Sequence, residues 1–446
     1  MFPSKRNFLK ILSELKNWSN YEHSLKFRDF SKLEGIKFLL KKLGNPEKTF
    51  RIIHIAGTNG KGSTALIISS LLKVQGFSTG CYTSPHLTDI RERIRLNDRL
   101  VSKKNFVDSA NIVLKIAQSF NGSQHFSYFD LLTAIAFHIF MINKVEWVVL
   151  ETGLGGRLDS TNVTNKELCV LTRIGFDHQD ILGKELKNIA EEKIGITRAN
   201  IPIVISSQDN KLKQWLKINL QKKNVPTFFV DEIFKIQYPE DFFLKKNVPP
   251  PQFENIITSL CAMQILFNGD IFQRIKWFKN AKKLKLPGRL DVRKNVFWEK
   301  NSQYFKKILI DGSHNEDSIL TLVKFISQND MFPYTLILGM ASDKLVNALH
   351  PQLKELCLKA NKIIFTPVDS PRTASTKLLD NFVFSKNKLE NTPDIQHVNS
   401  PEEALELSII FSDQPVVIAG SFYLVGEVMK ILNIRPAIKK NTSKKT

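Results

Sequence analysis

The 446-residue chain has little cysteine and no apolar stretch long enough to cross a membrane. Its four cysteines are widely separated and form no CxxC pair, which argues against a disulfide scaffold and against a structural zinc site. The longest apolar run, residues 131–142, is too short to span a bilayer. The basic amino-terminal residues lack the apolar core of a secretory signal, and the early Glu14 and Glu22 disfavour the alternative of an organelle transit peptide. We therefore expect reduced thiols, no membrane association and a cytoplasmic location. The cysteines are Cys81, Cys169, Cys261 and Cys357.

Acidic residues are outnumbered by basic ones. Lys and Arg total 64 against 43 for Asp and Glu, a formal net charge of +21. This surplus favours binding of an anion, which can be nucleic acid, acidic lipid or a small molecule, and the charge alone does not choose among them. With 42% hydrophobic and 24% charged residues the chain is not of the disordered class.

Short apolar runs alternate with helical patterns over residues 1–284. This alternation is typical of a parallel sheet wound in right-handed βαβ units, so we expect one α/β domain here. The predicted strands are 51–57, 145–151, 168–174 and 201–207, and the predicted helices are 63–75, 103–120, 129–142 and 184–199.

A second α/β set follows a break in the pattern. Residues 285–292, with Pro287 and Gly288 among charged residues, are predicted to be a linker between domains. Residues 293–434 form the second predicted domain, and the basic residues 435–446 are predicted to be a disordered tail. Its predicted strands are 307–312, 335–340, 362–367 and 416–420, and its last helix is 422–432.

A glycine-rich turn joins the first predicted strand to a helix in HIAGTNGKGSTALIISSLL, residues 54–72. Backbone N–H groups of such a turn, together with a helix N-terminus, bind phosphate oxygens, and Lys61 would neutralise them. The match to the usual phosphate-loop pattern is imperfect, because Gly62 separates Lys61 from Ser63. The alternative is an ordinary strand–turn–helix with a solvated lysine. We expect a nucleoside triphosphate site.

Two polar residues follow neighbouring predicted strands. Glu151 ends the strand at 145–151, and His178 comes after the strand at 168–174. Carboxyl ends of parallel strands meet at one edge of a sheet, where α/β proteins bind ligands. A carboxylate and an imidazole suit Mg²⁺ or Mn²⁺, and Ser84 offers a hydroxyl. Taken singly, Glu151 and His178 can equally be solvated or structural residues.

Three arginines alternate with other residues in the segment 83–98. Arg91, Arg93 and Arg95 fit a half-exposed strand or a basic loop. A solvated basic face and an anionic-substrate role remain open for them.

These segments together resemble the bacterial folylpolyglutamate synthase/dihydrofolate synthase family, which is related to the Mur ligases. The resemblance runs in order from about residue 20 to 432. The matching segments are GTNGKGS at 57–63, SPHL at 84–87, SYFDLLTAIAF at 127–137, ETGLGGRLDSTN at 151–162, DHQDILG at 177–183, IAEEKIGITR at 189–198, LPGRLDV at 286–292, DGSHNED at 311–317, GMASDK at 339–344, SPR at 370–372 and GSFYLVGE at 420–427.

The resemblance implies a P-loop ATPase-like domain with a mostly parallel sheet, followed by a smaller Rossmann-like α/β domain. It also implies an ATP-dependent, amide-forming ligase. The γ-phosphate of ATP passes to a carboxylate of a pteroate or folate, and the amine of L-glutamate then displaces phosphate from the acyl phosphate. The expected partners are small molecules only, ATP, L-glutamate and the acceptor, with Mg²⁺, two ions, as cofactor and with a monomeric protein.

Site residues follow from the same resemblance. Lys61, Lys193 and His314 match catalytic positions, and Lys193 matches a lysine that is carbamylated in the family; an exposed helical lysine is the alternative. The metal positions are Ser63, Ser84, Glu151, His178 and Lys193. The ATP positions are Gly57, Thr58, Asn59, Gly60, Lys61, Gly62, Ser63, Asn255, Arg289 and Asp311. The folate positions are Ser127, Phe129, Asp159 and Ser160.

The chain departs from the family pattern at Asp130, Glu316 and Leu345, and residues 232–252 have no counterpart that can be aligned. The sequence does not decide between dihydropteroate and folate as acceptor. Two other functions stay open: a Mur-type amino-acid ligase acting on another carboxylate, and a nucleic-acid-associated P-loop ATPase suggested by the charge. A structural protein with a degenerate nucleotide site is disfavoured, because Lys61, Glu151, His178 and Asp311 are all present.

Overall fold

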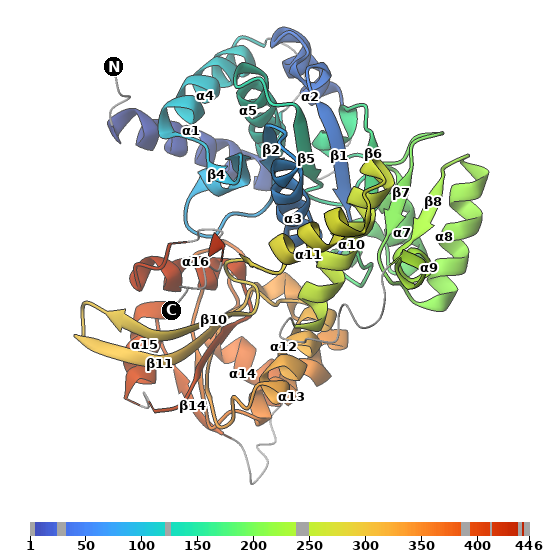
Figure 1. Ribbon diagram of the computed structural model, residues 1–446. Coiled ribbons are helices and arrows are strands. Elements are labelled where there is room, and N and C mark those ends of the chain that lie inside the picture. The colour runs from blue at the N-terminus through green and yellow to red at the C-terminus, as the bar shows by residue number, and fades with distance from the viewer. Residues whose placement is uncertain are drawn as a thin grey trace, which may run out of the picture. The chain divides into compact units, whose positions relative to one another are not determined.

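The computed structural model describes residues 5–24, 33–120, 126–237, 249–384, 393–410, 413–435 and 439–440. Contacts divide the chain into two units. The first comprises Met1–Ser84 and Arg91–Lys282, and the second comprises Pro85–Ile90 and Lys283–Thr446. Pro85–Ile90 thus groups with the second unit, although it falls within the predicted first domain. Each unit contains a mostly parallel sheet with helices, which confirms the predicted α/β class (Figure 1).

The sheet of the first unit has eight strands in the order β4-β3-β2-β5-β1-β6-β7-β8. From β2 to β8 the neighbours are parallel, and β3 and β4 extend one edge as antiparallel strands. All four predicted strands are present, each shorter than predicted, and the difference is largest for β6 and β7. The bounds are β1 Arg51–Ala56, β2 Thr79–Tyr82, β3 Ile94–Leu96, β4 Arg99–Leu100, β5 Trp147–Glu151, β6 Leu168–Leu171, β7 Ile203–Ile205 and β8 Thr227–Phe229.

Helices α3 and α5 cover opposite faces of this sheet. On β2, the Thr79 hydroxyl contacts Ser69 of α3, whereas the neighbouring Gly80 lies against Phe140 of α5. Successive residues of a strand face opposite sides, so the two helices must do so too. The helices are α1 Lys5–Ser24, α2 Glu34–Lys42, α3 Lys61–Val74, α4 Lys103–Gln118, α5 Tyr128–Ile142, α6 Gln179–Leu182, α7 Leu186–Ile194, α8 Asn210–Lys222, α9 Val230–Gln237, α10 Pro250–Phe267 and α11 Ile271–Ala281. Helix α7, Leu186–Ile194, is shorter than the predicted 184–199. It ends before Gly195, which packs against Arg157.

The expectation of a half-exposed arginine segment is wrong for two of its three arginines. Residues Ile90–Arg93 form a short 3₁₀ helix that leads into β3. Arg93 and Arg95 are buried, with the Arg93 guanidinium over the ring of Tyr128. Tyr128 comes from another part of the chain, so the alternating pattern did not reveal the burial of Arg93.

The second unit has a six-stranded sheet in the order β10-β11-β15-β12-β13-β14, parallel except for the β10–β11 pair. Its central strands are apolar on both faces: Ile308 and Ile310 of β11 enter one core cluster and Leu309 enters another. The strands of this sheet are β10 Asp291–Trp298, β11 Gln303–Ile310, β12 Thr335–Leu338, β13 Lys362–Phe365, β14 Asp394–His397 and β15 Val416–Ala419. Two further strands, β9 Leu284–Lys285 and β16 Lys439–Lys440, form a separate two-stranded sheet. The helices are α12 Glu316–Gln328, α13 His350–Leu358, α14 Thr376–Phe384, α15 Pro401–Ile409 and α16 Phe422–Ile431.

The segment predicted as a linker is part of this folded unit. Leu286 and Leu290 are buried, and β10 already begins at Asp291. In the predicted tail, β16 pairs antiparallel with β9, and residues 436–438 and 441–446 lie outside the described residues. All four cysteines are buried free thiols, which confirms that none forms a disulfide. Within the described ranges no helix is both long and apolar enough to cross a membrane.

Candidate active site

The order of three neighbouring strands places the phosphate loop and the segments of Glu151 and His178 at the carboxyl ends of the strands of the first sheet. Strand β1 lies between β5 and β6, and all three are parallel. Glu151 ends β5, Gly57 follows β1, and the segment leading to His178 follows β6. The phosphate loop, residues 57–63, is therefore flanked on both sides by the segments that hold Glu151 and His178. This is the edge at which open α/β sheets bind ligands.

Backbone hydrogen bonds hold the phosphate loop against the segment after β6. The N–H groups of Thr58 and Asn59 donate to the carbonyl oxygen of Arg173, at 2.9 and 3.3 Å. The Thr58 hydroxyl also donates to the Gly175 carbonyl and accepts from the Gly175 N–H, at 3.0 and 3.1 Å. Thr58 and Asn59 thus use their N–H groups within the protein. The donors suited to a phosphate are those of the first turn of α3, which begins at Lys61.

Two glycines of the loop are required by what lies against them. A Cβ atom on Gly57, with φ +151°, would lie 1.9 Å from the Thr172 hydroxyl oxygen. A Cβ atom on Gly60, with φ +86°, would lie 2.3 Å from Oδ1 of Asn255. The Thr64 hydroxyl contacts the same Asn255 oxygen at 3.4 Å. The structure therefore places Asn255, on α10, directly against the phosphate loop.

Two lysines approach the loop from different elements. The Lys61 ammonium donates to the Thr58 carbonyl at 3.1 Å. Lys193, on α7, is buried, and its Nζ donates to the Gly57 carbonyl at 2.7 Å. Burial, reinforced by the positive charge of Lys61, lowers the pKa of Lys193 to about 7, against opposing effects of Asp177 and Asp159. The predicted exposed-lysine alternative for Lys193 is thus wrong, and a large part of its population is neutral near pH 7.

The predicted metal residues supply hydroxyl, carboxylate and imidazole groups. Glu151 is buried, and its Oε2 accepts the Ser84 N–H at 2.9 Å, while Ser63 is buried in the first turn of α3. His178 is the N-cap residue immediately before α6 and has a left-handed conformation, with Asp177 beside its ring. Across the part of the chain that the structure describes, no three His, Cys, Asp or Glu side chains gather as a metal site on their own. This donor set fits Mg²⁺, which takes its remaining ligands from phosphate oxygens and water.

Asp177 is a residue of this region that the sequence analysis did not single out. It lies beside His178 and acts on the pKa of Lys193, so its charge bears on two predicted site residues. Its place next to His178 in DHQDILG was the available signal.

Two of the four predicted folate residues, Ser127 and Ser160, lie in one hydrogen-bond network. Ser127 and Asp130 cap α5 reciprocally, with both hydrogen bonds at 2.9 Å. The Ser160 hydroxyl donates to the other Asp130 oxygen at 2.6 Å, so Asp130 joins Ser127 to Ser160. The ring of Phe129 lies against Gly153, where an added Cβ would come within 2.7 Å of it. The fourth residue, Asp159, accepts hydrogen bonds on both oxygens from the protein itself.

The second unit brings its three predicted residues to one place. Asp311 is buried, which raises its pKa, and it accepts the N–H groups of Leu290 and Ser313 at 2.6 and 2.9 Å. The Arg289 guanidinium lies 4.9 Å from the ring centre of Phe422, and the His314 ring lies edge-on to the same ring at 5.7 Å. Phe422 was missed by the sequence analysis, because an aromatic residue opening a helix gives no local sign of two distant polar neighbours.

Comparisons with known proteins agree with this arrangement. Residues 55–233 match the Mur ligase middle domain, and residues 294–431 match the dihydrofolate synthetase C-terminal domain. The chain is 30% identical over 426 residues to a dihydrofolate synthetase of Saccharomyces cerevisiae, covering 90% of this chain and 97% of that protein. It is also 30% identical over 437 residues to a dihydrofolate synthase/folylpolyglutamate synthase of Bacillus subtilis, covering 92% and 96%.

The chain belongs to the dihydrofolate synthase/folylpolyglutamate synthase family. This confirms the predicted enzyme class, an ADP-forming acid–amino-acid ligase with a Mur ligase domain. A solved structure of a bifunctional folylpolyglutamate synthase/dihydrofolate synthase with Mn, AMPPNP and L-glutamate bound is 25% identical, with a TM-score of 0.75, covering 94% of this chain and 98% of that one. The alternatives of a nucleic-acid-associated ATPase and of a degenerate nucleotide site do not account for similarity over nearly the whole chain.

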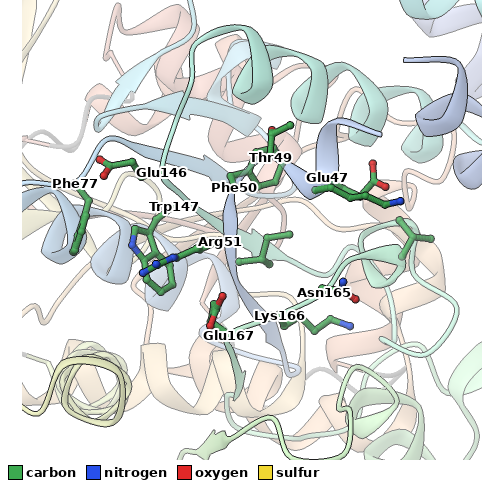
Figure 2. A pocket seen from close by; sticks show the side chains of 13 residues that line it. Glu47, Thr49, Phe50, Arg51, Phe77, Glu146, Trp147, Asn165, Lys166 and Glu167 are labelled. Carbon is green, nitrogen blue, oxygen red and sulfur yellow. The ribbon is translucent and has the colours of Figure 1, made fainter. Parts of the chain in front are cut away.

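A cavity of about 830 Å³ lies at the amino-terminal ends of the strands of the first sheet, whereas the phosphate loop follows the carboxyl end of β1 (Figure 2). Arg51 and Trp147, which begin β1 and β5, line it together with Lys166 and Glu167 before β6. None of the predicted site residues lines this cavity. The cavity therefore does not coincide with the predicted site, whose first-unit residues lie around the phosphate loop.

Proposed function

We propose that this chain adds L-glutamate to dihydropteroate, to reduced folates or to both, through an acyl phosphate, with release of ADP and phosphate. The observation behind the proposal is the phosphate loop of β1, flanked by the Glu151 and His178 segments and contacted by the buried Lys193. The names of the relatives include both acceptor activities, so the acceptor stays a matter for experiment.

The chemistry explains why such a site is needed. A carboxylate is a poor electrophile, and phosphorylation of the acceptor carboxylate creates a bond that the amine of L-glutamate can break with loss of phosphate. Two anions must meet in the first step. Lys61 and the N–H groups of the first turn of α3 would bind the phosphates of ATP and offset that charge. His314, with Arg289 and Asp311, would serve the glutamate and nucleotide from the second unit.

Ser63, Ser84, Glu151 and His178 would hold one Mg²⁺ ion, which when bound would neutralise the phosphoryl oxygens. Lys193 would contribute to a second ion once carbamylated, because a carbamate replaces its positive charge with a negative one. A neutral amine is the form that adds CO₂, and burial of Lys193 supplies that form near pH 7. Incorporation of ¹³C-bicarbonate, followed by carbon NMR of wild type and Lys193→Met, tests the modification directly.

We further propose that the enzyme acts as a monomer on small molecules in the cytoplasm, without nucleic acid or membrane partners. The net charge of +21 then serves to attract ATP and anionic folates. Light scattering of the purified protein tests whether it is a monomer, and its binding to a DNA oligonucleotide at low salt tests whether it binds nucleic acid.

The decisive experiment is glutamate-dependent ADP release in Mg²⁺, with dihydropteroate and tetrahydrofolate supplied in separate assays and products identified by mass. Turnover with either acceptor supports the proposal, and no turnover with any pteroate or folate refutes it. Lys61→Ala should lower kcat by about 100- to 1000-fold while leaving the unfolding curve unchanged. Products other than glutamylated pteroates would indicate a Mur-type ligase with another acceptor.

A further inference from the structure

A buried histidine lies in the strand that leads into the phosphate loop. His54 occupies the middle of β1, three residues before Gly57, and is completely buried. Burial, with smaller effects of Lys166 and Arg198, lowers the pKa of His54 well below its usual range. Its Nδ1 atom is buried and has no hydrogen-bond partner among the described residues. His54 is therefore a neutral imidazole with one unsatisfied nitrogen.

The other ring nitrogen belongs to a chain of hydrogen bonds. Nε2 of His54 lies 2.7 Å from the Thr161 hydroxyl oxygen, and that hydroxyl lies 2.5 Å from Oδ1 of Asp159. A hydroxyl has one proton, and a carboxylate can only accept. Thr161 therefore donates to Asp159, so His54 must carry its proton on Nε2 and donate to Thr161.

This series of hydrogen bonds ends at the backbone of the glycine-rich loop after Glu151. Oδ2 of Asp159 accepts the N–H groups of Gly153 and Leu154, at 2.8 and 3.0 Å. Gly153 is in turn the residue against which the ring of Phe129 packs. A hydrogen bond in β1 is thus linked, through two side chains, to the backbone beneath the predicted pterin-stacking ring.

We propose that His54 is a positioning residue for the acceptor site. By donating to Thr161 it orients the Asp159 carboxylate, and Asp159 fixes the Gly153–Leu154 backbone that sets the place of Phe129. The inference rests on the proposed function, because it assigns Phe129 to the acceptor.

A residue with a purely structural role would not need the Nδ1 atom of His54, which has no hydrogen-bond partner among the described residues. A buried polar atom without a partner lowers stability, and replacing both members of a hydrogen bond by apolar groups can be nearly neutral. Ile53 and Ile55 flank His54 on β1 and are fully buried, so an aliphatic residue would suit the strand. What the histidine adds is the directed Nε2–H donor.

The test compares Thr161→Val, which keeps the shape and removes the hydroxyl, with Thr161→Ser, which keeps the hydroxyl. His54→Leu and the double variant His54→Leu/Thr161→Val complete the series. We expect Thr161→Val and His54→Leu each to raise the acceptor KM by about threefold to tenfold, without change in the ATP KM. The double variant should show no more than the larger single effect, because both changes break one chain. Thr161→Ser, which keeps the hydroxyl, should have the wild-type acceptor KM.

An unchanged acceptor KM in both single variants, or an equal rise in the KM for ATP, would overturn the inference. If His54→Leu does not fold, the Thr161→Val and Thr161→Ser pair still decides it. Failure of the proposed function is distinguishable, since the wild-type protein would then turn over neither dihydropteroate nor tetrahydrofolate.

Discussion

The Nζ atom of Lys193 lies 2.7 Å from the carbonyl oxygen of Gly57, so a buried amine of α7 contacts the first residue of the phosphate loop. Lys61 lies in this loop, and its positive charge acts against protonation of Lys193. The two lysines therefore differ in kind: one is placed to bind phosphate as a cation, and the other is held largely uncharged above pH 7.

Lys193 predicts a pH dependence of stability. Its folded-state pKa of about 7 lies below the unfolded value of 10.5, so between these values the unfolded chain binds a proton that the folded chain does not. The free energy of unfolding of the wild type should therefore rise from pH 7 to 10 relative to Lys193→Met, with a constant gap below pH 7. Urea unfolding in buffers free of CO₂ and divalent metal measures this.

Lys222→Met is the matched control, because Lys222 is exposed at the end of α8. It should show the wild-type pH profile. If Lys193→Met followed that same profile, the depressed pKa of Lys193 would be refuted.

We expect substitution of Gly60 by alanine to weaken nucleotide binding, and not through backbone strain alone. Gly60→Ala places a methyl group against Asn255 and should weaken ATP-analogue binding more than tenfold in calorimetry, in addition to about 1–2 kcal/mol of left-handed strain. Gly76→Ala has the same kind of strain, with φ +100°, but nothing within 4 Å of the added atom.

Gly76→Ala should thus lower stability without affecting the nucleotide Kd. Adding Asn255→Ala to Gly60→Ala should recover part of the lost stability, because it removes the atoms that the new methyl group meets. Equal nucleotide affinities of Gly60→Ala and Gly76→Ala would contradict the packing argument.

The sequence predicts those parts of the candidate site that depend on segments adjacent to one another along the chain. The phosphate loop needs only a strand, a glycine-rich turn and a helix in succession, and these are contiguous. Glu151 was placed because a carboxylate at the end of a parallel strand is recognisable in one segment. His178 was predicted on the same reasoning, and the order β5-β1-β6 sets its segment on the other side of the loop.

What could not be predicted depends on residues far apart in the chain. Arg93 is buried with its guanidinium over the ring of Tyr128, a tertiary contact that no periodicity records. The same holds for the carboxyl end of the predicted linker 285–292, because β10 already begins at Asp291 and pairs with β11.

The basic residues around the end of α11 predict a preference for acceptors with longer glutamyl tails. Residues 274–294 include nine basic residues and one acid, and Lys282 and Lys283 are exposed. Attraction of an anionic tail to this charge predicts that the Lys282→Glu/Lys283→Glu variant raises the KM for tri- or tetraglutamylated folate about threefold to tenfold, with less change for the monoglutamate. Lys222→Glu/Lys223→Glu reverses two exposed charges on α8 and should leave both values unchanged. Equal KM values for wild type and the Lys282/Lys283 variant would assign these lysines to a solvated face.

Phe422 predicts a joint effect on ATP and on turnover, because its ring contacts both Arg289 and His314. Phe422→Leu removes the ring face beneath the Arg289 guanidinium, a contact worth about 0.5–2 kcal/mol, and should raise the ATP KM about twofold to tenfold while lowering kcat. Phe422→Tyr keeps the ring and should stay near the wild type, and Tyr423→Leu is the control that changes an exposed neighbouring ring. In a double-mutant cycle with Arg289→Ala, the effect of Phe422→Leu on the ATP KM should largely vanish, because the cation it serves is gone. An effect on ATP that persists undiminished in the Arg289→Ala background would show that Phe422 acts through general packing rather than through the arginine.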